Sequence, residues 1–212
     1  MRTEDLIRQL AGDTTTRPRA TLWQTLVTPS LITLLCAVVL TVAVYGIRAD
    51  IASVQAAVIS KQAVFAILVA AILPLVQQLI RPNTSVRHQL PLAVAPFVLS
   101  ALAAALFIHE QPADLRMVSW IGHGIPGCLY LIPPVALPGT LVLMWFVRLR
   151  QAPTRLAFAG AALGAFAGSF AGLAYALHCT SDEPAYVLSW YPLAILISAA
   201  IGAIAGRWML RW

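Results

Sequence analysis

Charged residues are scarce in this chain: they make up 10% of its 212 residues, whereas a soluble domain carries about a quarter. Hydrophobic residues make up 60%, so an ordinary soluble domain is excluded. Apolar runs of about 20 residues mark bilayer-spanning helices, and here such runs recur without the alternation of barrel strands. The sequence therefore predicts an all-α polytopic protein embedded in the lipid bilayer.

Sequence motifs of common enzymes are also missing. There is no Walker A lysine, no HExxH and no GxSxG, and none of the three cysteines forms a CxxC pair. No Asp, Glu, Lys or Arg falls within an expected span, although such residues usually mark ion and proton pathways. We therefore expect neither an enzyme nor a cofactor. A small membrane transporter or metal exporter is the alternative function, and a thiol oxidoreductase would need a second cysteine pair.

Six transmembrane helices are expected in residues 26–212. They cover about residues 26–47, 62–80, 90–108, 127–147, 156–177 and 185–206. Residues 1–25 precede them as a polar segment, in which Leu6, Ile7 and Leu10 have helical spacing. This spacing predicts a short amphipathic helix followed by a linker rich in Thr and Pro.

The basic residues orient the spans. Eleven of the 14 Lys and Arg residues lie in the two termini and the loops after spans 2 and 4, and only Arg48, Lys61 and Arg116 lie on the other side. The positive-inside rule then places both termini in the cytoplasm. The same rule explains the net charge of +6, so we expect no direct contact with nucleic acid.

Two cysteines fall on the predicted outer side, which in a bacterium is the periplasm, where disulfides form and persist. Cys128 begins span 4, and Cys179 lies in the stretch 174–190 that joins the last two spans. We favour a sensing role for these two thiols and predict that they lie close together without a fixed disulfide. Cys36 lies in mid-span, where we expect it only to pack.

Candidate metal ligands surround these cysteines. Imidazole and thiolate groups suit zinc, copper and similar metals. The candidates on the outer side are His123, His178, Asp182 and Glu183. Their spacing matches no compact metal motif, so for the histidines we favour ordinary polar positions in loops.

Glycines recur at four-residue spacing in span 5. They are Gly160, Gly164, Gly168 and Gly172. Residues four apart lie on one helix face, where glycine lets two backbones approach closely. The pattern predicts tight helix packing; a sliding surface is the alternative interpretation.

Several segments together resemble one family. They are the N-terminal MRTEDLIRQLAGD, the GC…IP…LP segment around Cys128, the APTR element at Ala152–Arg155, and LHC…P…WY around Cys179. Along essentially its whole length the chain resembles the NrsF-type membrane anti-sigma factors, which have six spans.

The resemblance implies a protein of the bacterial inner membrane that holds an extracytoplasmic-function sigma factor inactive at the cytoplasmic face. It also implies that two periplasmic-side cysteines, here Cys128 and Cys179, sense heavy-metal ions or oxidative stress. With such a partner, the apolar stripe of Leu6, Ile7 and Leu10 becomes the predicted sigma-binding element, because a short helix can dock into a partner's groove.

Overall fold

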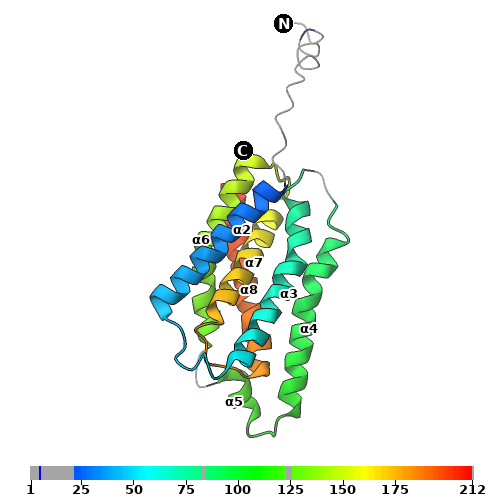
Figure 1. Ribbon diagram of the computed structural model, residues 1–212. Coiled ribbons are helices and arrows are strands. Elements are labelled where there is room, and N and C mark those ends of the chain that lie inside the picture. The colour runs from blue at the N-terminus through cyan, green and yellow to red at the C-terminus, as the bar shows by residue number, and fades with distance from the viewer. Residues whose placement is uncertain (1–4, 6–21, 83–84, 123–125, 212) are drawn as a thin grey trace.

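The computed structural model describes residue 5 and residues 22–82, 85–122 and 126–211 (Figure 1). These residues form helices and connections without a strand, so the predicted all-α architecture is confirmed. The elements are α2 (Leu22–Leu40), the π-helical turn η1 (Thr41–Tyr45), α3 (Gln55–Leu79), α4 (Gln89–Glu110), α5 (Arg116–Ile121), α6 (Gly127–Arg150), α7 (Leu156–Tyr175) and α8 (Pro184–Met209).

Six of the described helices are long and apolar enough to cross a membrane, as predicted. Five of them match the expected spans to within a few residues. The second begins at Gln55, seven residues before the expected position 62, and therefore contains Lys61. The expectation of spans without charged residues is thus wrong for Lys61, which is 3% exposed. The helix can include this lysine because an acidic residue neutralises it.

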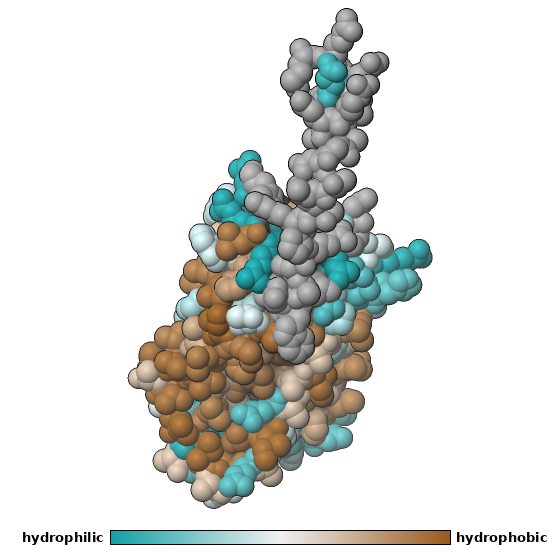
Figure 2. Space-filling view, turned by 45° about the horizontal axis from the view of Figure 1, so that its top comes forward, coloured by the Kyte–Doolittle hydropathy of each residue, from teal (hydrophilic) through white to brown (hydrophobic). Residues whose placement is uncertain are grey.

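Helix α7 occupies the centre of the bundle. In its most apolar 18-residue stretch 72% is buried, whereas the corresponding share in α4 is 17%. It packs against α8, α6 and α3. The flanks carry exposed apolar side chains such as Leu35 and Leu106. Figure 2 shows hydrophobic residues covering the side of the molecule and hydrophilic residues gathered towards one end. This distribution is compatible with a bundle that spans a membrane.

The glycines of α7 and α8 bring the two backbones into contact. An added Cβ would overlap the Gly202 carbonyl oxygen if placed on Gly160, and the Ser198 carbonyl oxygen if placed on Gly164. Further along α7, a Cβ on Gly172 would lie 2.6 Å from the Phe65 ring of α3. The α7–α8 seam therefore holds two helices at backbone contact, which fits packing better than sliding.

Helix α2 packs across α6 and α7 (Figure 1). It meets α6 where the Thr33 hydroxyl donates a hydrogen bond to the Gly139 carbonyl at 3.3 Å. A side chain on Gly139 would overlap Thr33, so the glycine permits this close crossing.

The two ends of the bundle differ in charge. The acidic end, at the bottom of Figure 1, carries residues 46–54, residues 111–122 with the short helix α5, and residues 176–183, with Asp50, Asp114, Asp182 and Glu183. The basic end carries residues 80–82, 85–88 and 151–155 and the end of α8, with Arg81, Arg87, Arg155 and Arg211.

Candidate functional site: two thiols beside a buried ion cluster

Arg48 is buried at the acidic end, although it lies in the connection between α2 and α3. Gly46, at a φ of 77°, turns the chain out of the π-helical turn, a conformation that favours glycine. The Arg48 amide then donates to the Leu177 carbonyl at 3.1 Å, which ties this connection to the end of α7. The residue as a whole is 6% exposed.

The Arg48 guanidinium binds two carboxylates. Its Nε and Nη2 donate to Asp50 at 2.7 and 2.9 Å, and its Nη1 and Nη2 donate to Asp182 at 2.8 and 3.0 Å. Such bidentate pairs are the strong form of this interaction. The hydrogen bonds that Arg48 donates to Asp50 and Asp182 raise its pKa. In turn, hydrogen bonding to Arg48 lowers the pKa of both carboxyl groups.

Lys61 completes the group from α3. Its Nζ lies 2.6 Å from Asp182 Oδ1 and donates to the Cys179 carbonyl at 3.1 Å. Arg48 Nη1 donates to the same carbonyl at 3.0 Å. Arg48, Asp50, Lys61 and Asp182 form a neutral ion cluster, whose two cations both bind the main chain of Cys179. Intramembrane charges are costly unless paired, and they commonly mark functional positions.

The two thiols lie next to the ion cluster. Both are free and buried, with Cys128 at 0% and Cys179 at 6% exposure. The Cys128 Sγ donates to the Tyr186 hydroxyl at 3.6 Å. The Cys179 Sγ makes a weak contact of 3.9 Å with the Ser181 carbonyl.

Three tyrosines enclose these sulfurs. Tyr175 and Tyr191 pack with a ring-centroid distance of 5.9 Å, the Tyr186 hydroxyl accepts from the Cys128 thiol, and the Tyr175 hydroxyl lies beside Gly127, the residue before Cys128. We use the name thiol site for Cys128, Cys179, Tyr175, Tyr186 and Tyr191. Its members come from α6, α7, α8 and the connection between α7 and α8, so it joins four segments at one point.

The Tyr191 hydroxyl has no hydrogen-bond partner of good geometry among the described residues. Its polar neighbour is the Cys179 thiol, and its residue is fully buried against Phe65, with ring centroids 5.0 Å apart. Buried hydroxyls without a partner are rare and call for an explanation. In this case the hydroxyl without a good acceptor, that of Tyr191, lies beside the Cys179 thiol.

A polar pocket of about 500 Å³ opens at the acidic end next to the thiol site. Its lining includes Thr180, Ser181, Asp182 and Glu183 on one side, and Gln111, Leu115 and Ser119 on the other. Tyr186 also lines this pocket, and its hydroxyl contacts Cys128. One aromatic side chain therefore separates the pocket from the most deeply buried thiol.

The structure does not assemble the candidate metal ligands. His178 Nδ1 lies 3.2 Å from the Gly46 carbonyl oxygen, and its ring packs against Tyr45 and Tyr175. Asp182 belongs to the ion cluster, and Glu183 precedes α8 as its N-cap. No group of three or more His, Cys, Asp or Glu residues in the described part of the chain is placed to hold a metal. His123 lies outside the described residues, as do Leu6, Ile7 and Leu10.

Sequence reasoning missed the structural roles of four residues in this region. Arg48 and Lys61 counted only as outer basic residues, Tyr186 only as an aromatic residue near the membrane surface, and Tyr191 was given no role. One signal was present: these two cations are two of only three on the predicted outer side, where the positive-inside rule disfavours them. The structure explains these two basic residues, because Asp50 and Asp182 neutralise their charges.

Fold and site define a class of protein: a bundle of six apolar helices, long enough to cross a membrane, with two free thiols beside a buried ion cluster at one end. The chain belongs to the NrsF family, since the family model described as "Negative regulator of sigma F" matches residues 10–212. The resemblance noted in the sequence is thereby confirmed.

Two curated relatives are similar to the chain. The anti-sigma-F factor NrsF of Caulobacter vibrioides (strain NA1000 / CB15N) is 33% identical over 140 residues, which is 65% of this chain and 64% of that protein. The probable anti-sigma-F factor NrsF of Azospira oryzae (strain ATCC BAA-33 / DSM 13638 / PS) is 35% identical over 112 residues, which is 53% and 52% of the respective chains. The chain therefore spans between half and two thirds of these relatives. No solved structure is significantly similar to it.

Proposed function

We propose that this chain is an anti-sigma factor of the bacterial inner membrane, which sequesters an extracytoplasmic-function sigma factor and releases it under heavy-metal or oxidative stress. The observation that carries the proposal is the family match over residues 10–212, together with the names of both relatives. A regulatory role of this kind needs no catalytic group.

The sigma factor binds at the basic end in this proposal. The excess of Lys and Arg in the termini and in the loops after the second and fourth spans supports a cytoplasmic location for that end. Residues 1–25, with the apolar Leu6, Ile7 and Leu10, supply the main docking element. The arginines of the basic-end connections, such as Arg81 and Arg155, add contacts.

Cys128 and Cys179 receive the signal. Soft metal ions and oxidants react with thiols in preference to other side chains. Both sulfurs are buried, so joining or enlarging them strains the surrounding side chains, and overpacking of a core costs about 1–3 kcal/mol. A cost of that size is enough to change the balance between two conformations that differ by a few kcal/mol.

The polar pocket supplies the route to the thiols. Its Glu183 carboxylate, which is exposed and makes no ion pair within the described residues, attracts cations to the acidic end. Tyr186 closes the inner wall of the pocket, so a rotation of this one ring exposes Cys128. The Tyr191 hydroxyl, which lacks a partner in the reduced state, is available to donate to an oxygen added to Cys179.

The ion cluster relays the signal. Because Arg48 and Lys61 both bind the Cys179 carbonyl, a displacement of Cys179 pulls on the connection before α3 and on α3 itself. Helices α7 and α8 meet at backbone contact along their glycines and move as one body. Helices α2, α3 and α6 therefore shift relative to the α7–α8 pair. Because each of them runs the length of the bundle, the shift also displaces their ends at the basic end.

Co-purification tests the proposal directly. The sigma factor encoded next to this gene should co-purify with the full chain in detergent, and deletion of residues 2–15 should release it while the membrane protein stays inserted. Capture that survives this deletion at normal protein levels would place the binding surface in the loops. Failure to capture the sigma factor with the intact chain would refute the anti-sigma role.

Cysteine variants test the sensing step separately. Cys128→Ser and Cys179→Ser should each leave repression intact and abolish induction by metal ions and oxidants. Cys36→Ser is the matched control and should change neither, because Cys36 lies in mid-span away from the ion cluster. A full response from the double variant Cys128→Ser/Cys179→Ser would show that the signal enters elsewhere.

Reporter fusions test the orientation. A fusion after residue 212 should report the cytoplasm, and an insertion within residues 178–184 should report the periplasm. A periplasmic C-terminus would refute the topology, and with it the placement of both thiols.

A further inference from the structure

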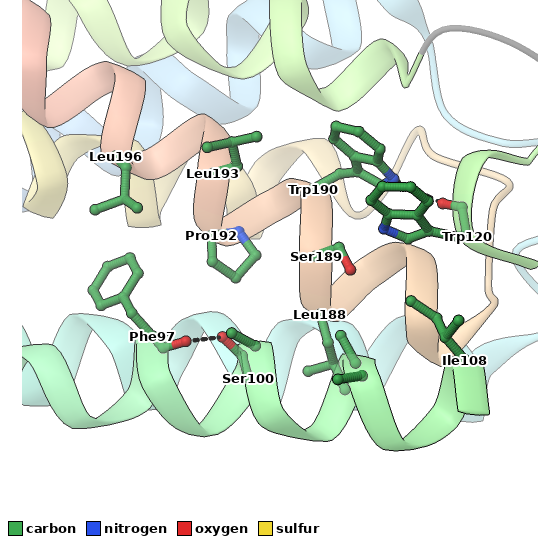
Figure 3. A pocket seen from close by; sticks show the side chains of 13 residues that line it. Phe97, Ser100, Ile108, Trp120, Leu188, Ser189, Trp190, Pro192, Leu193 and Leu196 are labelled. Carbon is green, nitrogen blue, oxygen red and sulfur yellow. Dashed lines mark hydrogen bonds between the residues drawn. The ribbon is translucent and has the colours of Figure 1, made fainter. Parts of the chain in front are cut away.

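An apolar groove runs along the outside of the bundle between α4 and α8 (Figure 3). It has a volume of about 400 Å³, within the range of about 300–1,000 Å³ that ligand pockets occupy. Its walls include Phe97, Ala101, Ala105 and Ile108 from α4, and Leu188, Leu193 and Leu196 from α8. The stacked Trp120 and Trp190 rings lie at one end of it.

The lining favours a hydrocarbon chain over a polar ligand. Its hydroxyl groups belong to Ser100 and Ser189, and the Ser100 hydroxyl already donates to the Phe97 carbonyl of its own helix at 2.9 Å. From Phe97 to Ile108 the groove follows twelve residues of α4, whose ends are eleven helical rises apart, or about 16 Å. This length matches one leaflet, about half of the 30 Å hydrocarbon core.

The tryptophan pair marks the membrane-surface end of the groove. Trp190 Nε1 donates to the Trp120 carbonyl at 2.7 Å, and the ring centroids are 5.5 Å apart. Tryptophan is enriched at the level of the lipid headgroups because one part of the ring is apolar and another polar. The groove thus begins at headgroup depth and ends near Leu196, towards the middle of the bilayer.

A cation lies at that same end. Arg116 begins α5, one helical turn before Trp120, and its Nε and Nη2 donate to the Gln111 and His109 carbonyls at 3.0 and 3.2 Å. These two bonds hold the guanidinium beside the Ile108 end of α4. Arg116 is exposed and makes no ion pair with a carboxylate within the described residues, so its charge is available to an anion.

We propose that this groove binds an anionic phospholipid, with one acyl chain between α4 and α8 and the phosphate on Arg116. The groove supplies the apolar length, the tryptophan pair sets the depth, and Arg116 selects the negative headgroup. The bound lipid would fill the space beside Pro192 of α8, next to Tyr191 of the thiol site. The bound lipid would thereby pack against the side of α8 that faces away from the thiol site.

Native mass spectrometry of the full chain tests the site, with phosphatidylglycerol and phosphatidylethanolamine supplied in equal amounts. The wild-type chain should retain phosphatidylglycerol preferentially. Arg116→Gln should reduce that preference about fivefold, the equivalent of roughly 1 kcal/mol for one basic residue near a lipid surface. Arg155→Gln, which removes a charge at the basic end, should leave the preference unchanged.

Filling the groove tests the acyl-chain position. Ala105→Phe, at an exposed position of the lining, should abolish retention of both lipids, and Ala101→Phe should do the same. Leu106→Phe is the matched control on the same helix, since Leu106 is exposed outside the groove. Circular dichroism confirms that each variant keeps its helices.

Three results would overturn the proposal: equal retention of the two lipids by the wild-type chain, unchanged retention in both alanine variants, or a wild-type dimer that Ala105→Phe dissociates without loss of lipid. The last would assign the groove to a second copy of the chain. None of these results depends on the sigma factor, so the lipid site and the anti-sigma role can fail independently.

Discussion

Replacing Asp182 by Asn tests whether the ion cluster holds the Cys179 connection. The wild-type cluster sets two cations against two carboxylates. The Arg48 and Lys61 side chains are 2% and 3% exposed, respectively. In Asp182→Asn, only Asp50 remains to neutralise them, and it contacts Arg48 alone. Lys61 is then a buried cation without a counter-charge.

The size of the effect follows from this imbalance. Removing one partner of a buried ion pair costs about 3–5 kcal/mol. The Asp182 side chain is 30% exposed, so water offsets part of the loss, and we expect the lower end of that range, about 3 kcal/mol. Adding Lys61→Met removes the unpaired cation and leaves the Arg48–Asp50 pair intact. The double variant should therefore recover at least about 1 kcal/mol relative to the sum of the single changes.

Thermal unfolding in detergent micelles, followed by tryptophan fluorescence, measures the difference. Glu183→Gln is the control, because it removes the neighbouring carboxylate, which is exposed and makes no ion pair within the described part of the chain. This change should stay within about 0.5 kcal/mol. The reasoning is refuted if Asp182→Asn destabilises the protein no more than Glu183→Gln does, or if the double variant shows no recovery.

Further predictions concern pH, the glycine seam and the buried tyrosine. Arg48 and Lys61 lower the pKa of folded Asp182, so its stabilising contribution is complete above the usual carboxyl pKa of about 4 and is lost as pH falls through the lower folded value. Unfolding temperatures should fall with acidification below about pH 4 in the wild-type chain, with a smaller fall in Asp182→Asn. Gly164→Leu should cost at least about 3 kcal/mol in thermal unfolding, because its side chain meets the Ser198 carbonyl; the exposed Phe158→Leu should cost little. Tyr191→Phe should leave the unfolding temperature unchanged or higher, since it removes an unpartnered buried hydroxyl. Reporter induction in the same variant should drop, and full induction would exclude the hydroxyl from signalling.

The spans could be predicted from the sequence because each of them is a continuous apolar run, and lipid leaves helices as the only structure that such runs can form. The start of the second span was missed for a local reason: Lys61 interrupts the run between Ala57 and Val64, and hydropathy takes it for a loop residue. What makes Lys61 acceptable inside α3 is a contact with the Cys179 connection, 118 residues away in the chain. No local pattern contains such information.

The candidate site shows the same limit. The position of Cys128 and Cys179 on one side followed from counting charges and spans, because topology alone decides it. The enclosure by Tyr175, Tyr186 and Tyr191 did not, since it depends on how α6, α7 and α8 rotate about their axes. The six-residue helix α5 was also missed, because its Trp120 and Met117 lie in a segment too short to show a helical period.

The crossing of α2 over α6 has a mechanical consequence. Thr33, held against Gly139, lies eleven residues after Leu22 and twelve before Tyr45, so the helix extends about 16 Å to one side of the contact and about 18 Å to the other. It resembles a lever with a fulcrum near its middle. One arm leads to Arg48 and the Cys179 carbonyl, and the other joins residues 1–21. A helix that pivots there swings its two ends in opposite directions, so a displacement at the acidic end reappears with the opposite sense at Leu22, reduced by the bending that Pro29 and the π-helical turn allow.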